Sequence, residues 1–495
     1  MELNGLLDGV PVTKMFQTVF GKMASTHDVM VSGIYYDSRR VERDGIFVAL
    51  RGAAADGHRF IADAIAKGAK VIVTEDDMNP PDPLCMHTGT VKLVVSDARK
   101  ALARLSANYY GHPSAKLRMI GVTGTNGKTT TAYLIKQLLE ADPTAKVGLI
   151  GTIEYLIGSE TLPATHTTPE SLELQRLLAR MVSAGCTHAV MEVSSHALHQ
   201  YRVYGIDFAA AVFTNLTQDH LDYHGTMTEY FNAKKILFDS LSPGAAAIVN
   251  ADSPHGALII EDTRARVVTY GIAASAEYRA VNVAMTTEGF SAEINGTRVE
   301  TRMTGTFNVL NFLAAYAAVN TVAPGIGITA ETIRGLRPAP GRFEQFHSTL
   351  GWTAIVDYAH TPDALENCLQ TIRAILPADY AGSVITVFGA GGDRDALKRP
   401  LMGAIAVRYS DRVIVTSDNP RTEDPMAIVN GILSGITDKS TVTVLVDRGA
   451  AIEHALASAK PGDVVLLAGK GHEEYQVIGS EKIHFSDKEI VAQFL

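Results

Sequence analysis

The sequence predicts an α/β protein with three domains: a small N-terminal α/β domain, a central domain on a parallel sheet, and a C-terminal Rossmann-like domain. Three observations predict this. The chain has 495 residues, too many for one hydrophobic core and typical of about three domains. Short apolar runs alternate with helical patterns along most of its length. A glycine-rich segment, residues 121–130, stands between an apolar run and a helical pattern.

Composition excludes several classes of protein. A hydrophobic fraction of 46% with 20% charged residues is typical of globular domains, and a net charge of -9 gives no general attraction to nucleic acid. Cys85, Cys186 and Cys368 lie far apart, which argues against a disulfide framework or a zinc site and fits a reducing compartment. No basic segment followed by a long apolar run lies near Met1, and nowhere do about 18 apolar residues run together. We expect a soluble cytoplasmic protein without membrane insertion.

Residues 1–113 form the first predicted domain. Short runs rich in β-formers at 35–40, 45–50 and 70–74 and a helical stretch at about 97–110 indicate a small α/β unit. Glycine and proline at 111–113 mark its end. Taken alone, Asp37-Ser38-Arg39 reads as a turn with a local side-chain cap.

The second predicted domain spans residues 114–336. Apolar runs at 117–122, 147–150, 188–193, 209–213 and 245–249 alternate with helical patterns, as in a mostly parallel sheet covered by helices. Ligands collect at the carboxyl ends of such strands. Glu192 follows one run and His220 another, so both are candidates for a magnesium site beside bound phosphates. Either residue alone is more often structural.

The segment Gly121-Val122-Thr123-Gly124-Thr125-Asn126-Gly127-Lys128-Thr129-Thr130 indicates a phosphate-binding loop. Glycines free backbone amides, the following helix supplies its positive end, and a lysine and a hydroxyl complete a site for polyphosphate and magnesium. The first glycine is out of register, because Val122 stands where the usual pattern has glycine. The alternative is a plain glycine-rich turn. We predict a variant loop in a domain of the P-loop ATPase type.

Lys234 lies on an apolar helix face. In a helix over 229–240 its neighbours one turn away are Tyr230, Phe231, Leu237 and Phe238. The side chain either extends to solvent along that face or is buried. If buried, its amine is driven toward the neutral form and becomes a nucleophile, including toward carbon dioxide.

Residues 337–495 repeat the alternating pattern, with apolar runs at 353–356, 384–388, 412–415, 441–446 and 463–467. The glycines at 389–392 are only a weak dinucleotide signal. Arg394, Arg421 and Glu473 lie in loops that follow apolar runs. Two guanidiniums and a carboxylate suit an amino acid with an extra carboxylate. The alternative is a set of solvated loop charges.

Together these motifs resemble the Mur ligases of peptidoglycan synthesis, over nearly the whole chain. Residues 124–130, 215–224, 305–311, 340–342 and 357–362 match the family, whose loop has the same shorter form. Residues 37–39, 166–169 and 192–198, and above all Asp418-Asn419-Pro420-Arg421, are similar to the member that adds the third residue of the stem peptide.

The resemblance implies ATP and Mg²⁺ as cofactors and two substrates, UDP-N-acetylmuramoyl-L-alanyl-D-glutamate and meso-2,6-diaminopimelate. For ATP it implies Gly124, Thr125, Asn126, Gly127, Lys128, Thr129, Thr130, Asn308, Asn311, Arg342, Asp357 and His360. For the nucleotide sugar it implies Tyr36, Ser38, Ala53, Ala54, Ala55, His166, Thr167, Thr168, Ser194, Gln200 and Arg202. His166 stands where some relatives carry asparagine. For diaminopimelate it implies Arg394, Asp418, Asn419, Pro420, Arg421, Gly469 and Glu473.

The implied catalytic residues are Lys128, Glu192, His220 and Lys234, and the implied metal site comprises Thr129, Glu192, His220 and a carbamoylated Lys234 (N6-carboxylysine). The implied reaction passes through an acyl phosphate, and we expect a monomer. Three alternatives stay open: a lysine-adding Mur ligase, a ligase similar to folylpolyglutamate synthase, and a regulatory P-loop ATPase with no small-molecule acceptor.

Overall fold

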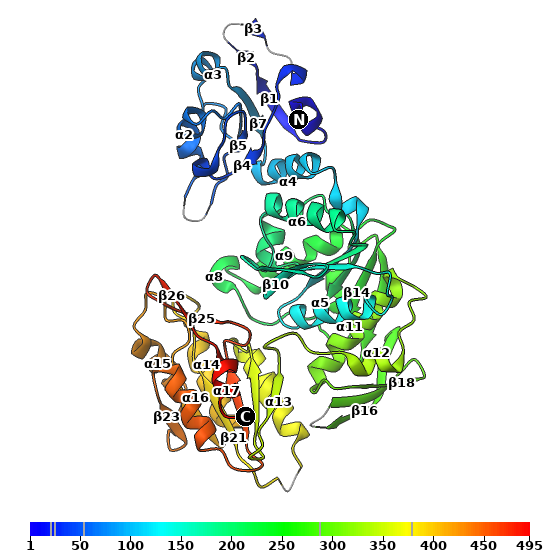
Figure 1. Ribbon diagram of the computed structural model, residues 1–495, viewed down its shortest axis with the longest axis vertical. Coiled ribbons are helices and arrows are strands. Elements are labelled where there is room, and N and C mark those ends of the chain that lie inside the picture. The colour runs from blue at the N-terminus through cyan, green and yellow to red at the C-terminus, as the bar shows by residue number, and fades with distance from the viewer. Residues whose placement is uncertain (20–21, 24–25, 53–54, 287–288, 378–379) are drawn as a thin grey trace. The chain divides into compact units, whose positions relative to one another are not determined.

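A computed structural model describes the chain except residues 20–21, 24–25, 53–54, 287–288 and 378–379. The chain divides into two compact units. Figure 1 labels the helices and strands and colours the chain by residue number. The first comprises residues 1–120, 146–150 and 156–209, and the second residues 121–145, 151–155 and 210–495. The fold is α/β, with an N-terminal, a central and a C-terminal sheet, which confirms the predicted fold class. None of the described helices is long and apolar enough to cross a membrane.

The N-terminal sheet has the strand order β1-β7-β6-β5-β4. Strands β4 to β7 pair in parallel and β1 pairs antiparallel with β7. The residues of β6 are all buried, as expected for a strand covered on both faces. The helix predicted at 97–110 is α4, and its N-terminus is capped by the Asp97 carboxylate, which accepts from the N–H groups of Arg99 and Lys100. The elements are α1 Leu3–Leu6, β1 Val12–Phe16, β2 Thr18–Val19, β3 Lys22–Met23, β4 Ile34–Tyr35, β5 Ile46–Val48, α2 Ile61–Ala66, β6 Val71–Thr74, α3 Asp82–Thr88, β7 Val91–Val95 and α4 Ala98–Tyr109.

The central strands follow the predicted runs closely. Strand β9 pairs in parallel with β12, and β13, β14 and β15 pair in parallel with one another. Helix α11 is hydrophobic on all sides and therefore buried. The elements are β8 Arg118–Thr123, α5 Lys128–Leu139, β9 Val147–Ile150, β10 Glu154–Ile157, β11 Glu160–Pro163, α6 Ser171–Ser183, β12 His188–Glu192, α7 Ser195–His199, β13 Phe208–Phe213, α8 Leu221–His224, α9 Met227–Asp239, β14 Ala246–Asn250, α10 Gly256–Ile259, β15 Arg266–Gly271, α11 Thr306–Val322 and α12 Ala330–Gly335.

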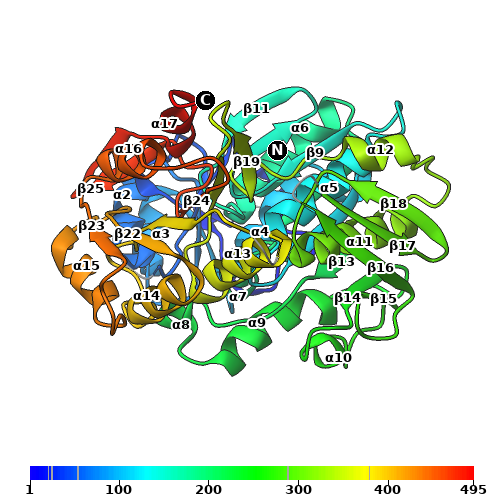
Figure 2. The same cartoon turned by 90° about the horizontal axis from the view of Figure 1, so that it is seen from below.

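An antiparallel extension of the central sheet was not predicted from the sequence. Strands β16 Tyr278–Thr286, β17 Gly289–Ile294 and β18 Thr297–Thr301 pair antiparallel and lie side by side in Figure 2. The exposed face of β16 is polar, so its burial alternates and it lacks the continuous apolar run of the parallel strands. This pattern of half-buried strands gives a weaker sequence signal than a buried parallel strand does.

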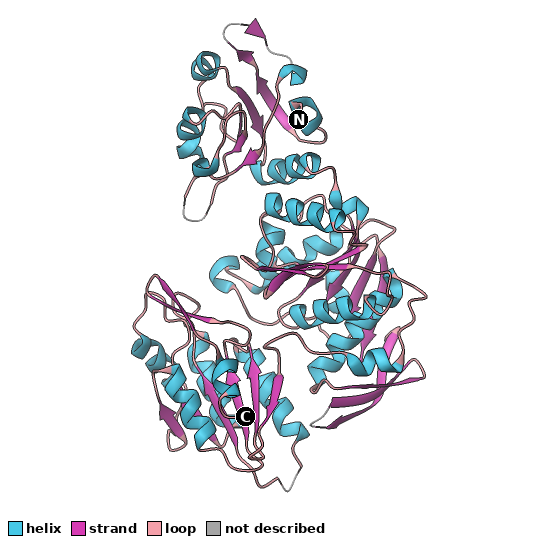
Figure 3. Ribbon diagram, in the orientation of Figure 1, coloured by secondary structure: helices cyan, strands magenta, loops and turns pink. Residues whose placement is uncertain are grey.

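The C-terminal sheet, in the order β19-β20-β24-β21-β22-β23, is covered on both faces. Alternate residues of β21 enter two separate cores: Val384 and Phe388 belong to one, Ile385 and Val387 to the other. Helices α13 and α14 cover one face and α16 and α17 the other (Figures 2 and 3). The elements are β19 Glu344–His347, β20 Thr353–Asp357, α13 Pro362–Ile375, β21 Val384–Phe388, α14 Lys398–Tyr409, β22 Arg412–Val415, α15 Pro425–Leu433, β23 Val442–Val444, α16 Arg448–Ala457, β24 Val464–Ala468, β25 Tyr475–Ile478, β26 Glu481–His484 and α17 Asp487–Ala492.

Candidate active site

The glycine-rich loop joins β8 to α5 and is fixed by hydrogen bonds to the residues that follow β13. The N–H groups of Thr125 and Asn126 donate to the backbone and side-chain oxygens of Asn215, both at 2.9 Å. Gly124 and Gly127 have φ of +146° and +85°, and added Cβ atoms would overlap Thr214 Oγ1 and Asn311 Oδ1. The structure therefore supplies the strand, loop and helix context that a phosphate-binding loop requires.

Lys128 begins α5, and its side chain folds back over the loop. Its Nζ donates to the carbonyls of Gly124 at 2.9 Å and Thr125 at 2.8 Å. The two neighbouring hydroxyl residues, Thr129 and Thr130, are buried. An ammonium held above a helix N-terminus is placed to meet a phosphate group.

A pocket of about 110 Å³ opens beside the loop. It is smaller than common small-molecule sites, about 300–1,000 Å³, so it accommodates only part of a nucleotide in this conformation. Six of the residues predicted to bind ATP line it, and Asn308 supports it through a 3.2 Å hydrogen bond from Asn311 Nδ2 to its Oδ1. Those six are Asn126, Gly127, Thr130, Asn311, Arg342 and Asp357.

Arg342 is the cation on the far wall of this pocket. Its Nη2 donates to Thr129 Oγ1 at 3.2 Å, and its Nε is buried without a partner among the described residues. A buried N–H without a partner suits an anionic ligand. Nearby, the Phe343 N–H donates to Asp357 Oδ2 at 2.6 Å, and burial raises the pKa of the Asp357 carboxyl despite Arg342.

His220 and His360 both favour the neutral form. Burial lowers the pKa of His220, and Lys128 and Lys234 act in the same direction, although Asp219 opposes them. Because 42% of the His220 side chain is exposed, solvent weakens this effect. Burial, reinforced by Lys398, lowers the pKa of His360 to about 4. Since His360 is absent from the lining of the nucleotide pocket, its predicted ATP contact stays a prediction.

Lys234 is buried, which contradicts the alternative of a side chain extended to solvent. The residue is only 1% exposed and lies on α9, as the helical pattern predicted. Its Nζ donates to the Gly124 carbonyl at 2.9 Å and lies 4.4 Å from the Tyr230 ring centroid. Burial, together with Lys128, lowers the pKa of Lys234 well below its usual value. The Lys234 amine therefore lies against the phosphate loop in surroundings that favour its neutral form.

In the first unit, several residues predicted to hold the nucleotide sugar form one network around Thr168. Its Oγ1 donates to the Glu192 carbonyl at 2.7 Å and accepts from the Ser194 N–H at 3.0 Å. Arg202 donates to the Thr168 carbonyl at 2.8 Å and to Gln200 Oε1 at 2.8 Å. These side chains are oriented by one another, as a preformed binding surface requires.

The remaining predicted nucleotide-sugar residues differ in their exposure to solvent. His166 is exposed, and its Nδ1 lies 3.4 Å from Thr165 Oγ1. Thr167 is half-buried and Ala55 exposed, while Ala53 and Ala54 lie outside the described residues.

At the N-terminal turn, the Asp37 carboxylate accepts from the Arg39 N–H at 3.0 Å, which confirms the predicted local cap. Hydrogen bonding by Arg39 lowers the pKa of Asp37 to about 2, although burial opposes it. Ser38 is buried, and Tyr36 donates to Glu173 Oε2 at 3.0 Å. A pocket of about 260 Å³ includes Tyr36 and Asp37 in its wall.

The predicted metal ligands come from both units: Glu192 from the first, and Thr129, His220 and Lys234 from the second. Within the described residues, no group of three or more histidine, cysteine, aspartate or glutamate side chains is arranged to hold a metal alone. Mg²⁺ usually takes one or two protein ligands and completes its shell with phosphates and water. Within the second unit, the Thr129 hydroxyl and the His220 imidazole offer that number of protein ligands.

Three loops of the C-terminal sheet bring the predicted amino-acid residues together. Asn419 Nδ2 donates to Glu473 Oε2 at 2.9 Å. Arg421 has φ of +53°, a left-handed conformation unusual for a residue with a side chain, and its Nη1 donates to the Gly392 carbonyl at 2.6 Å. Gly469 has no room for a Cβ beside Asp418 Oδ2, which is 2.6 Å away. Arg394 is exposed in the adjoining loop.

Lys470, whose buried side chain contacts residues of two of these loops, was not predicted from the sequence. Its side chain is fully buried, and its Nζ donates to Glu473 Oε2 at 3.0 Å and Asn419 Oδ1 at 3.3 Å and lies 3.7 Å from Asp418. A buried ammonium costs free energy unless it is paired, so Lys470 fixes the positions of three acceptors. The glycines on either side of Lys470 were the sequence signal for a tight loop around it.

Tyr358 was also missed, and it joins the nucleotide pocket to the amino-acid loops. The Arg342 Cζ lies 4.5 Å from the Tyr358 ring centroid, and the His472 ring centroid lies 5.1 Å away. A Cβ on Gly341 would overlap the backbone of Gly471 and His472. The linker before Arg342 therefore packs directly on the loop that carries Glu473.

The environment of His472 predicts how the stability of the protein depends on pH. Burial, with Arg342, Lys488 and Lys470, lowers its pKa to about 3. In the unfolded state the His472 imidazole takes up a proton below its ordinary pKa of about 6.5, whereas in the folded state it stays neutral down to a lower pH. The free energy of unfolding therefore falls as pH decreases, by at most about 1.4 kcal/mol per pH unit. We expect His472→Gln to lessen the fall in thermal midpoint between pH 6.5 and 4. His87→Gln, at an exposed position, is the control, and equal slopes in both variants would contradict the assignment.

The site is that of an α/β P-loop enzyme in which a nucleotide pocket adjoins loops suited to a charged amino acid. Three segments match family descriptions: residues 30–110 match "Mur ligase family, catalytic domain", 122–319 "Mur ligase middle domain" and 341–471 "Mur ligase, glutamate ligase domain". The chain belongs to the Mur ligase family.

Individual Mur ligases are similar to this chain over most of its length. The chain is 44% identical over 471 residues to the UDP-N-acetylmuramoyl-L-alanyl-D-glutamate--2,6-diaminopimelate ligase of Cytophaga hutchinsonii, covering 94% of this chain and 95% of that protein. A solved structure of an enzyme with the same name matches with a TM-score of 0.68 and 33% identity, over 97% of this chain and 98% of that one. A MurF ligase from Thermotoga maritima in complex with ADP shares the fold, with a TM-score of 0.61, 20% identity, and 89% and 94% covered.

Proposed function

We propose that this enzyme uses ATP to join meso-2,6-diaminopimelate to the D-glutamate of UDP-N-acetylmuramoyl-L-alanyl-D-glutamate. The observation that carries the proposal is the loop cluster in which the Glu473 carboxylate accepts from Asn419 and from buried Lys470, while the Arg421 guanidinium is held on the Gly392 carbonyl of an adjoining loop. A guanidinium and a carboxylate can pair with the carboxylate and the ammonium of an amino acid. The relative from Cytophaga hutchinsonii, named as this ligase, supports the substrate assignment.

In the proposed reaction, Lys128 and the loop amides hold the ATP phosphates while the glutamyl carboxylate attacks the terminal phosphoryl group, forming an acyl phosphate and ADP. The amine of diaminopimelate then attacks the acyl carbon, loses a proton, and phosphate leaves. Lys128 and Arg342 stabilise the negative charge that develops on oxygen. Mg²⁺, when bound, neutralises phosphate charge, and Thr129, Glu192, His220 and Lys234 would hold it.

We propose further that Lys234 acts as a carbamate. Its neutral amine adds to carbon dioxide, forming an N–C bond and releasing one proton, so that an uncharged amine becomes a negatively charged carbamate. Burial of Lys234 favours the neutral amine that this reaction needs. Its hydrogen bond to the Gly124 carbonyl places the amine beside the phosphate loop. A carboxylate at this position is a hard oxygen ligand for Mg²⁺.

The proposed setting is a cytoplasmic monomer. ATP and the nucleotide sugar are cytoplasmic metabolites, and the three cysteines of the chain are buried and form no disulfide. Sedimentation of the purified enzyme measures the oligomeric state.

Phosphate release tests the function. We expect release from ATP only when both UDP-N-acetylmuramoyl-L-alanyl-D-glutamate and an amine are present, with meso-diaminopimelate far better than lysine. A glutamate-terminated folate as acceptor tests the folylpolyglutamate alternative. Equal release without any nucleotide sugar would favour a regulatory ATPase and contradict the ligase.

Gly124→Ala should weaken ADP binding at least about tenfold, because the new Cβ overlaps Thr214 Oγ1 and displaces the loop from its left-handed geometry. Gly244→Ala is the matched control, since its Cβ meets nothing within 4 Å. Calorimetric titration with ADP gives both constants. Unchanged affinity in Gly124→Ala would show that the loop does not hold the phosphates.

A further inference from the structure

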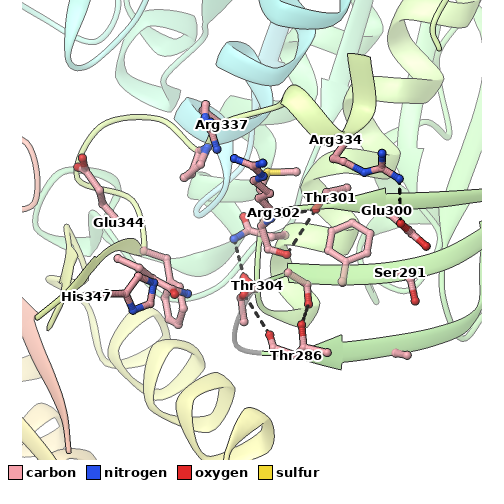
Figure 4. Close-up of a pocket in the computed structure, with 18 of the residues that line it drawn as sticks. Thr286, Ser291, Glu300, Thr301, Arg302, Thr304, Arg334, Arg337, Glu344 and His347 are labelled. Atoms are coloured by element: carbon pink, nitrogen blue, oxygen red, sulfur yellow. Dashed lines mark hydrogen bonds and ion pairs between the residues drawn. The ribbon is translucent and has the colours of Figure 1, made fainter. Parts of the chain in front are cut away.

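The nucleotide pocket is not the largest cavity of the second unit. A pocket of about 900 Å³ lies among β17, β18, α12, the segment 337–340 and β19 (Figure 4). Its volume is in the range of sites for small molecules, about 300–1,000 Å³. None of the residues assigned above to the amino-acid loops or the nucleotide sugar lines it; of the predicted ATP residues, only Asn308 does.

The two carboxylates in its wall already have partners. Glu300 lies 3.1 Å from Arg298 and 3.1 Å from Arg334. Glu344 Oε2 accepts from the Gly341 N–H at 2.7 Å and lies 3.7 Å from Lys488 Nζ. Their negative charge is therefore shared with cations that the chain itself supplies.

The arginines in the wall are in excess over these carboxylates. Arg302 and Arg337 form no ion pair with any described residue, and Arg334 has only its contact with Glu300. The three come from the end of β18, from α12 and from the following segment, and Figure 4 shows them along one side of the pocket. Only Arg334 of these three guanidiniums is paired with a carboxylate of the wall, so this side of the pocket carries an excess of positive charge that suits an anion.

The rest of the pocket lining suits the uncharged part of a ligand. Phe290, Met303 and Phe343 supply apolar surface, and Thr286 and Ser291 supply hydroxyls across the pocket from the arginines in Figure 4. An apolar lining with a few convergent polar groups is typical of ligand sites.

We propose that this pocket binds a small organic phosphate, with the phosphate between Arg302 and Arg337 and the organic part against Phe290 and Phe343. A phosphate dianion matches two guanidiniums better than a single carboxylate does, because it offers more charge and more acceptor oxygens. The site is distinct from the nucleotide pocket and lies outside the proposed ligase reaction.

Phenyl phosphate is the test probe, and benzoate is its carboxylate counterpart. The full-length protein is first saturated with ADP, because Asn308 and Phe343 also contact Asn311 and Asp357 of the nucleotide pocket. Calorimetry should then give a Kd for phenyl phosphate at or below about 1 mM, and benzoate should bind at least about tenfold more weakly.

The variant Arg302→Ser/Arg337→Ser should weaken phenyl phosphate binding at least about tenfold. Both side chains are exposed, so the fold is expected to survive, and an unchanged thermal midpoint checks this. Arg264→Ser, which removes an exposed arginine of the second unit that does not line the pocket, should leave the Kd unchanged. Absence of binding below about 10 mM, equal binding of benzoate, or equal affinity in the double variant would each overturn the proposal.

Discussion

Lys234→Ala is expected to lower kcat by about a thousandfold, the size of effect seen when a group that stabilises transition-state charge is removed. In the proposed enzyme this side chain, carbamoylated, supplies a carboxylate to Mg²⁺ beside the phosphate loop. In the structure its Nζ already contacts the loop carbonyl of Gly124 at 2.9 Å. Steady-state phosphate release measures the loss.

Two further measurements separate the carbamate from a purely structural role. Acetate or propionate should restore part of the activity of Lys234→Ala, because a free carboxylate can enter the space left by the side chain. Intact mass of the wild-type protein after a rapid bicarbonate quench should show the addition of one carbon dioxide. Lys235→Ala, whose side chain instead pairs with Asp239 and Asp262, is the matched control and should keep its activity. Failure of both rescue and mass addition would exclude the carbamate.

Arg421→Ala is expected to lower kcat/KM for meso-diaminopimelate by about a hundredfold or more, since truncating one partner of a charged pair typically costs 2–5 kcal/mol. The value for lysine should change far less, because lysine has no second carboxylate for the guanidinium to meet. The ratio of the two constants therefore falls.

Arg421→Lys refines this prediction. It keeps the charge but loses the two-pronged donor geometry, so its ratio should lie between those of the wild type and Arg421→Ala. Arg408→Ala removes an exposed arginine of α14 and should leave the ratio unchanged. An unchanged ratio in Arg421→Ala would sink the assignment of Arg421 as the residue that selects diaminopimelate.

Buried parallel strands could be predicted from sequence because covering both faces requires continuous apolar runs. The runs at 384–388 and 412–415 coincide with β21 and β22. The antiparallel strands β16 to β18 escaped prediction because one face of each is polar and weakens the apolar signal.

The residues of the candidate site likewise divide into those that can be recognised in the sequence and those that only the fold reveals. Residues with an unusual local requirement, such as Gly124, stand out in the sequence because few residue types satisfy them. Lys470 did not stand out, because its role depends on acceptors that the fold brings from a loop about fifty residues away, at Asp418 and Asn419. Nor could the sequence decide between an exposed and a buried Lys234, since α9 has apolar residues around this position and burial is settled by tertiary packing.

The contact of Gly341 with the backbone of Gly471 and His472 bears on the order of events in catalysis. The Gly341 backbone lies so close to that of Gly471 and His472 that an added Cβ would overlap them, so the linker before Arg342 cannot move toward the loop carrying Glu473 without displacing it. This backbone contact would couple phosphoryl transfer to the capture of the amine. In the proposed reaction, such coupling would favour capture of the amine after the nucleotide is bound, which would limit hydrolysis of the acyl phosphate.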